Sequence, residues 1–189
     1  MMIGITGTAG AGKSFFAQIV KETIPSFSIM ELNDIAAEHN LFSGTDKFGT
    51  RIVKVSALNS KVKALQKNGK DANIALVGHL LPELKTDLDM VFVVRANLEE
   101  LIKRLEGRGY QFEKIKDNII AEALDYCGVN SIHLSKDVFE IEGRAEMENA
   151  AKLLKAHIEH GKPIDIKNKP IDKMPELLSL IKGANKYKF

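Results

Sequence analysis

The sequence predicts an α/β fold with a parallel β-sheet and crossover helices, because strand and helix patterns alternate along the chain. Two uninterrupted apolar runs, over 74–77 and 90–94, are typical of strands that are buried on both faces of a parallel sheet. The chain has 189 residues, of which 44% are hydrophobic, and this size and composition predict a single globular domain over 1–189.

Hydrophobic spacing predicts two strands and three helices in the first part of the chain. A glycine-rich segment separates the first strand from the first helix, and Asn33 and Asp34 are expected to cap the second helix. In order, these elements are a strand over 2–6, a helix over 15–22, a strand over 27–30, a helix over 35–38, a loop over 40–50 and a helix over 55–67.

The remaining sequence predicts three more strands, which gives a five-stranded sheet, and four further helices. Asn97 is expected to cap a helix that reaches Leu105, and two nearby glycines interrupt the helical pattern after it. The other elements are strands over 74–77, 90–94 and 138–141 and helices over 113–126, 145–158 and 175–181.

A phosphate-binding loop is predicted between the first strand and the first helix, where the sequence matches G-x-x-x-x-G-K-[ST]. Glycines allow successive backbone N–H groups to turn inward around an anion, and the following helix directs its positive dipole end at the phosphates. Lys13 adds a positive charge at the β- and γ-phosphates, and the Ser14 hydroxyl can coordinate Mg²⁺. The residues expected to bind the nucleotide here are Gly7, Thr8, Ala9, Gly10, Ala11, Gly12, Lys13, Ser14 and Phe15.

A basic turn later in the chain is a candidate lid over this loop. Arg108 lies between two glycines, and Arg104 precedes it by one helical turn. The planar, permanently charged guanidinium suits phosphate oxygens on which charge develops during transfer. The alternative is a solvated helix face on which these arginines pair with Glu100 or Glu106.

The loop pattern alone does not choose between the classes of nucleotide-binding protein. The guanine-reading sequence N-K-x-D of GTPases is absent, since the segment over 168–172 is one residue too long. Small-molecule kinases need an acceptor-binding insertion and a lid that excludes water. The sequence has a candidate for each, which favours this class.

Several segments, in the same order from about Met2 to Ala151, carry a family resemblance. They are Ile5-Thr6-Gly7-Thr8-Ala9-Gly10-Ala11-Gly12-Lys13-Ser14, Leu32-Asn33-Asp34-Ile35-Ala36, Gly78-His79, Arg104-Leu105-Glu106-Gly107-Arg108-Gly109-Tyr110, Lys114-Ile115 and Asn118-Ile119-Ile120-Ala121-Glu122-Ala123. In these segments the chain resembles the adenylate kinase isoenzyme 6 (CINAP-type) family. The resemblance implies a P-loop nucleoside monophosphate kinase-like three-layer sandwich, with a monophosphate-binding insertion over about 34–67 and a lid over about 106–117.

The resemblance also implies a function, the conversion of ATP and AMP to two ADP, with a weak ATPase activity and, in several members, a role in maturation of the small ribosomal subunit. We expect Lys13 and Arg108 to act in catalysis, with Arg104 as a further ATP contact and Mg²⁺ held at Ser14. His79 is expected near the phosphates, where it can donate to the γ-phosphate or orient water, or else to cap a strand by bonding to backbone. The residues expected to bind AMP or another nucleoside monophosphate are Asn33, Asp34 and Arg51.

The chain departs from the family pattern at four positions. Val77 stands where the family usually has an acidic residue, two positions before the histidine, and this removes the expected carboxylate for Mg²⁺ or its water shell. Lys54 replaces an acidic residue of the monophosphate-binding insertion. Ala37 replaces an arginine that members of the family often have at this position, and Phe15 replaces the threonine that usually follows Ser14. These departures predict a larger loss of AMP binding and metal positioning than of ATP binding.

A second hypothesis is an ATP-responsive assembly factor for the small ribosomal subunit, with a ribosomal protein as partner and vestigial kinase activity. It rests on the departures and on the basic extension over 162–189, which has seven lysines against three acidic residues. We expect this extension to be solvated, with a contact to RNA or the ribosome as the alternative. A kinase for another small acceptor, such as a sugar or a cofactor precursor, is a third option.

Composition also bears on location. The formal net charge of +2 does not by itself indicate a nucleic-acid binder. The longest apolar run, over 90–94, is far shorter than the roughly 20 residues of a membrane-spanning helix, and the N-terminal residues lack the pattern of a signal peptide. Cys127, the only cysteine, excludes an intrachain disulfide framework and is expected to be a small core residue. We therefore expect a cytoplasmic protein without membrane association.

Overall fold

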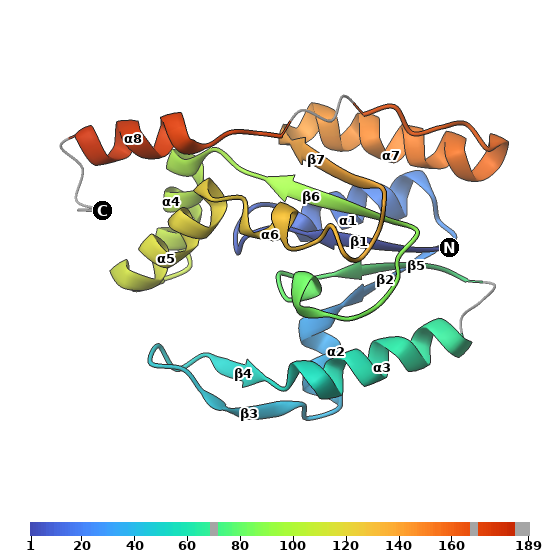
Figure 1. Cartoon of the computed structure of the whole chain (residues 1–189), viewed down its shortest axis with the longest axis horizontal. Helices are drawn as coiled ribbons and strands as arrows, with labels where there is room; N and C mark the ends of the chain where they lie inside the picture. The colour runs from blue at the N-terminus through green and yellow to red at the C-terminus, as the bar shows by residue number, and fades with distance from the viewer. Residues whose placement is uncertain (69–71, 167–169, 184–189) are drawn as a thin grey trace.

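A parallel five-stranded sheet forms the centre of the protein, in a computed structural model that describes residues 1–68, 72–166 and 170–183 (Figure 1). The strand order is β2-β5-β1-β6-β7. These strands are β1 (Met2–Thr6), β2 (Phe27–Glu31), β5 (Asn73–Val77), β6 (Met90–Arg95) and β7 (Val138–Glu142). The predicted α/β class and the five parallel strands are confirmed.

Helices cover both faces of the sheet, which gives three layers (Figure 1). The helical elements are α1 (Lys13–Thr23), α2 (Leu32–Glu38), α3 (Val55–Asn68), the 3-10 turn η1 (Leu81–Glu83), α4 (Leu98–Gly107), α5 (Phe112–Ala123), α6 (Tyr126–Val129), α7 (Gly143–His160) and α8 (Met174–Lys182). Because side chains along a strand alternate between faces, Ala75 and Val77 join one buried cluster, with α1, α4, α5 and α7, whereas Ile74 and Leu76 join the other, with α2 and α3. Within the described ranges, no helix has both the length and the apolar character needed to span a bilayer.

The carboxyl ends of all five strands lie at the same edge of the sheet, because every pair is parallel. The strand β1 is central, and the glycine loop leaves its carboxyl end between β5 and β6. The register pairs Val77 with Ile5 on one side and with Glu31 on the other. Ligands of open α/β sheets bind outside this edge, so a ligand of this protein is expected there.

The segment predicted as a loop over 40–50 instead contains part of a β-hairpin. Its strands are β3 (Phe42–Thr45) and β4 (Arg51–Val53). Asp46 closes the turn, since its Oδ1 accepts hydrogen bonds from the N–H groups of Phe48 and Thr50, each at 2.8 Å. The prediction was wrong because strands of four and three residues are too short to show an alternating pattern.

Two helix boundaries also differ from the predictions. The helix α2 begins at Leu32, directly after β2, so Asn33 and Asp34 lie inside its first turn and do not cap it. The helix predicted over 113–126 ends at Ala123 in α5, and the short helix α6 begins at Tyr126, after Asp125 adopts the left-handed backbone conformation with φ 51°. The apolar residues keep their helical spacing up to this break, so the hydrophobic pattern of the sequence does not show where the helix ends.

The segment after α7 packs against the edge of the sheet beside β7. Lys173 is 3% exposed, and its Nζ donates to carboxylate oxygens of Glu142 at 2.5 Å and of Glu176 at 2.7 Å. Glu176 also accepts a hydrogen bond from the N–H of Leu98, at the start of α4, where the side chain of Asn97 forms the predicted cap. The prediction of a solvated extension is therefore wrong for Lys173, whereas Lys162 and Lys182 are exposed as predicted. Four of its lysines lie outside the described residues: Lys167, Lys169, Lys186 and Lys188.

Candidate active site

The loop between β1 and α1 has the geometry of an anion-binding nest. Gly7 has φ +140°, and a Cβ atom there would lie 2.2 Å from the carbonyl oxygen of Val94. Gly10 and Gly12 also have positive φ angles, of +87° and +116°. Such angles allow the N–H groups of the loop to turn toward a phosphate in front of the N-terminus of α1. The predicted phosphate-loop residues are thus folded around one cradle.

Lys13 holds its ammonium inside this loop. Its Nζ donates to the carbonyl oxygens of Gly7 and Thr8, at 2.9 Å each. Burial lowers the pKa of Lys13 to about 8, and the nearby guanidinium of Arg108 adds to this effect. The nearby carboxylates of Glu31 and Glu122 offset only part of this cost, and a bound phosphate would supply further negative charge.

Ser14 faces an acid that sequence reasoning missed. Its Oγ donates a hydrogen bond to Oε1 of Glu31, at 2.8 Å. Glu31 is the last residue of β2, one position beyond the predicted strand, and it lies beside Val77 in the sheet. Ser14 and Glu31 line a cavity of about 310 Å³ in front of the loop. The other side chains along this cavity include Lys13, Asn33, His79, Arg108 and Tyr110.

His79 follows β5 at the rim of the same cavity. Partial desolvation by the surrounding protein lowers the pKa of its imidazole to about 4, and the positive charges of Lys13 and Lys114 contribute, while the residue stays exposed to solvent at the rim. The ring is therefore neutral at neutral pH, with one nitrogen that donates and one that accepts a hydrogen bond. A neutral ring of this kind can donate to a phosphate oxygen or orient a water molecule.

Arg104 reaches the phosphate loop from α4. Its Nη1 donates to the carbonyl oxygens of Gly10, at 3.2 Å, and Ala11, at 3.4 Å. Its Nη2 forms an ion pair with Glu100 at 2.7 Å. Arg104 therefore forms the predicted ion pair with Glu100 and also contacts the phosphate loop.

Arg108 lines two adjoining cavities. One is the cavity in front of Lys13, and the other, of about 430 Å³, is also lined by Arg104 and Arg144. Loop residues Gly10 and Gly12 line both cavities. The guanidinium of Arg108 therefore lies where ligands in the two cavities would approach each other.

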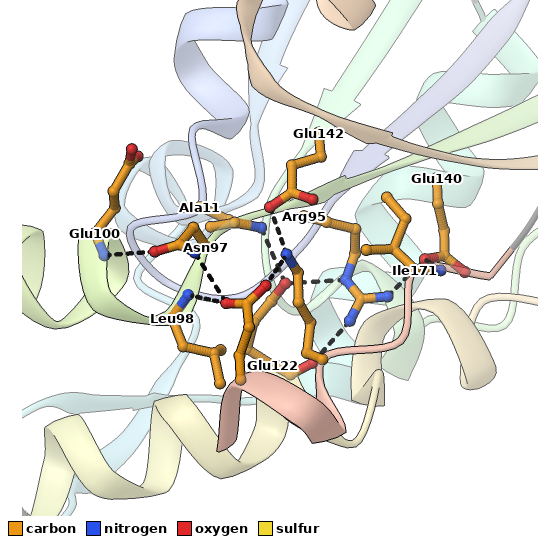
Figure 2. A network of polar contacts seen from close by, with 12 residues as sticks. Ala11, Arg95, Asn97, Leu98, Glu100, Glu122, Glu140, Glu142 and Ile171 are labelled. Carbon is orange, nitrogen blue, oxygen red and sulfur yellow. Dashed lines mark hydrogen bonds and ion pairs between the residues drawn. The ribbon is translucent and has the colours of Figure 1, made fainter. Parts of the chain in front are cut away.

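A buried ion network supports the loop from the side of α5 (Figure 2). Thr8 Oγ1 donates to Oε2 of Glu122 at 2.6 Å. The other oxygen of Glu122 accepts hydrogen bonds from Arg95 Nε at 2.9 Å and from the N–H of Ala96 at 3.1 Å. Arg95 also pairs with Glu140 on β7, at 2.6 Å. Since Arg95 and Glu122 are each 2% exposed, this network fixes the loop to β6, β7 and α5.

The roles of Arg95 and Glu122 were also missed from the sequence, although each has a local signal. Arg95 directly follows the apolar run over 90–94, so it continues a buried strand. Glu122 lies seven residues after the buried Ile115 and thus on the same face of α5. Because a buried charged residue is rare unless it is paired, a cation on the buried strand and an acid on the buried face of α5 together predict an ion pair.

The predicted acceptor residues are not all brought together. Asn33 lines the cavity in front of Lys13, whereas Asp34 lines a separate cavity of about 460 Å³ beside β2, α2 and α3. Arg51 lies on the hairpin, where its guanidinium is 4.0 Å from the centre of the Phe42 ring. The structure therefore places only Asn33 directly in the cavity in front of the phosphate loop.

The hairpin and the start of α5 touch each other. Lys114 Nζ donates to Oγ1 of Thr50 at 2.6 Å, and it lies 4.4 Å from the centre of the Tyr110 ring. Both elements lie at the left of Figure 1. The segments predicted as insertion and lid thus meet through Lys114, beside the cavity that Tyr110 lines.

Comparisons with known proteins show the family to which this chain belongs. Residues 3–125 match the AAA domain family. A protein of Methanosarcina acetivorans named "Putative adenylate kinase" is 32% identical over 162 residues, which cover 82% of this chain and 85% of that protein. A protein of the same name from Pyrococcus abyssi is 34% identical over 142 residues, which cover 75% of this chain and 74% of that protein.

A solved structure shares the fold. Shikimate kinase from Acinetobacter baumannii, in complex with shikimate, matches with a TM-score of 0.55 and 14% sequence identity, over 85% of this chain and 94% of that one. At this identity the similarity bears on the fold alone, which is that of a P-loop kinase. From its sequence matches, this chain belongs to the AAA domain family and to the family of archaeal proteins named "Putative adenylate kinase".

Proposed function

We propose that the protein is an ATP-dependent nucleoside monophosphate kinase of the adenylate kinase type, which converts ATP and AMP to two ADP. The observation that carries this proposal is the position of Arg108, which lines both cavities beside the phosphate loop. The names of the relatives support the same reaction. The resemblance to the isoenzyme 6 family supports AMP as the acceptor, and the single cysteine, Cys127, fits a reducing compartment such as the cytoplasm.

The cavity of about 430 Å³ is the proposed place for the nucleoside of ATP. Phe15 is 44% exposed there, and the guanidinium of Arg144 lies 5.7 Å from the centre of its ring. An exposed aromatic ring and a planar guanidinium offer flat surfaces to a purine base. Arg104 lines the same cavity, and the triphosphate then extends into the loop before Lys13.

Mg²⁺ fits the chemistry of the donor atoms at the loop, because the Ser14 hydroxyl is an oxygen ligand of the kind that this ion prefers. When bound with ATP, Mg²⁺ neutralises part of the charge on the β- and γ-phosphates. Within the described residues, no group of three or more His, Cys, Asp and Glu side chains forms a metal site. The phosphates themselves are therefore expected to supply several of the ligands.

In the proposed reaction, an α-phosphate oxygen of AMP forms a bond to the γ-phosphorus of ATP as the bond to the β-phosphate oxygen breaks. Lys13 and Arg108 stabilise the negative charge on the transferred oxygens. Asn33 and the neutral His79 offer hydrogen bonds to the acceptor phosphate from the walls of the same cavity. The contact of Lys114 with the hairpin helps to exclude water, which would otherwise accept the phosphoryl group.

Calorimetric titration of AMP in the presence of a non-hydrolysable ATP analogue tests this proposal. We expect AMP to bind at one site, with a Kd in the range of roughly 1 μM to 1 mM that is usual for enzyme substrates. An Asn33→Ala variant is expected to bind AMP more weakly while it keeps its affinity for the analogue, because Asn33 lines only the cavity in front of Lys13. Absence of binding by AMP, GMP, CMP and UMP would contradict the proposal.

A different outcome would favour the second hypothesis. In that outcome the protein binds ATP and hydrolyses it weakly but accepts no monophosphate. Val77 and Lys54 are the reason to consider it, because they predict weakened binding of the metal and of AMP. That result would point to an ATP-responsive assembly factor with a ribosomal partner. Lys173 is buried in ion pairs and therefore gives this hypothesis no support, whereas the exposed Lys162 and Lys182 are free to contact a partner.

A further inference from the structure

We propose that Glu31 supplies the carboxylate of the magnesium site in this protein. The proposal rests on the ATP-dependent function proposed above and names the residue that holds the metal beside Ser14. The neighbouring strand β5 offers no acid there, because its last residue is the buried Val77. Glu31 is the register partner of Val77, so the side chain of Glu31 is attached at the end of the adjacent strand, β2.

The first argument is the contact between Glu31 and the phosphate loop. Ser14 Oγ donates its proton to Glu31 Oε1 at 2.8 Å. A hydroxyl that donates its proton in this way keeps its lone pairs available for a cation. The contact therefore orients Ser14 as a ligand and places a carboxylate within one hydrogen bond of it.

The second argument is the charge of the cavity. Among the described side chains that line it, Glu31 is the only carboxylate, and it faces the cations Lys13 and Arg108. A carboxylate beside a polyphosphate repels it and would weaken the binding of free ATP. A divalent cation between the two groups changes this repulsion into attraction on both sides. The acid therefore favours the metal complex of ATP over the free nucleotide.

The third argument is the number of ligands. Mg²⁺ is usually bound through one or two carboxylates together with substrate phosphates and water. Ser14 and Glu31 give one hydroxyl and one carboxylate at the mouth of the phosphate loop. This set is incomplete without ATP, so the metal is expected to bind together with the nucleotide.

The test is calorimetric titration of ATP in excess Mg²⁺ and in EDTA. For the unaltered protein, we expect Mg²⁺ to tighten ATP binding by about tenfold, which corresponds to about 1.4 kcal/mol. In Glu31→Gln this gain is expected to disappear, while the affinity for ATP in EDTA stays equal or rises because the repulsion is removed. Glu31→Asp is expected to keep most of the gain, and Glu22→Gln, an exposed acid on α1, all of it.

A second readout is the electron paramagnetic resonance spectrum of Mn²⁺ in the presence of ATP, which reports metal bound to the complex without any turnover. We expect Glu31→Gln to bind Mn²⁺ more weakly than the unaltered protein. An unchanged gain from Mg²⁺ in Glu31→Gln, or no gain in the unaltered protein, would overturn the role of Glu31 and leave the kinase proposal standing. If the unaltered protein binds no ATP under either condition, the proposed function fails, and the role of Glu31 fails with it.

Discussion

Replacing Lys13 with alanine is expected to lower kcat/KM for ADP formation by roughly two to three orders of magnitude, as for other preorganised groups that stabilise transition-state charge. The Lys13 ammonium donates to two loop carbonyl oxygens at 2.9 Å each, which holds it at the proposed phosphate position. Its pKa is lowered to about 8, chiefly by burial, so the charge is poorly stabilised until phosphate binds. Steady-state kinetics with ATP and AMP measure the loss.

The matched control is Lys103→Ala, which removes an exposed lysine from α4. It is expected to leave kcat/KM within about twofold and stability within about 0.5 kcal/mol, as for most surface substitutions. Urea unfolding should also give Lys13→Ala a midpoint close to that of the unaltered protein. A loss of less than tenfold in folded Lys13→Ala would contradict the assigned role of this residue.

Replacing Arg95 with methionine is expected to destabilise the protein by about 3–5 kcal/mol, the range for breaking a buried ion pair. The substitution leaves the carboxylate of Glu122 buried without its guanidinium partner and removes the pair with Glu140 (Figure 2). Urea unfolding at neutral pH measures the change. Because Glu122 also accepts a hydrogen bond from Thr8, weaker ATP binding is expected to accompany the lower stability.

An exposed pair provides the comparison for Arg95. Arg144 and Glu148 form an i, i+4 ion pair at 2.7 Å on the surface of α7, and Arg144→Met is expected to cost less than about 1 kcal/mol. Arg95 pairs with three carboxylates, which belong to Glu122, Asp125 and Glu140. A double variant, Arg95→Met with Glu122→Gln, is expected to be more stable than Arg95→Met alone, since it removes the most deeply buried of these three carboxylate charges. Equal effects of Arg95→Met and Arg144→Met would show that the buried network contributes little.

The fold was predictable because its signals are local and redundant. Strands such as 74–77 and 90–94 are apolar on both faces, and this pattern is typical of the centre of a parallel sheet. The glycine loop has a fixed spacing and lies between a strand and a helix, so its place at the sheet edge follows. The β3–β4 hairpin was not predictable in this way, because short exposed strands carry no periodic signal.

Parts of the site depend on contacts between residues far apart in the chain. Thr8 and Glu122 are 114 residues apart, and their hydrogen bond requires α5 to pack behind the loop. Ser14 and Glu31 are 17 residues apart, and they meet where the start of α1 lies beside the carboxyl end of β2. Neither contact follows from hydrophobic spacing, since both depend on where a strand or helix ends in space.

The central claim is tested most directly by quantifying ADP formed from ATP and AMP in the presence of Mg²⁺, with Lys13→Ala as the reference. The account predicts formation of two ADP for each AMP consumed, at a rate that depends on both nucleotides and falls to background in Lys13→Ala. Absence of any nucleoside diphosphate above that background, with AMP, GMP, CMP and UMP each tried as acceptor, would contradict it.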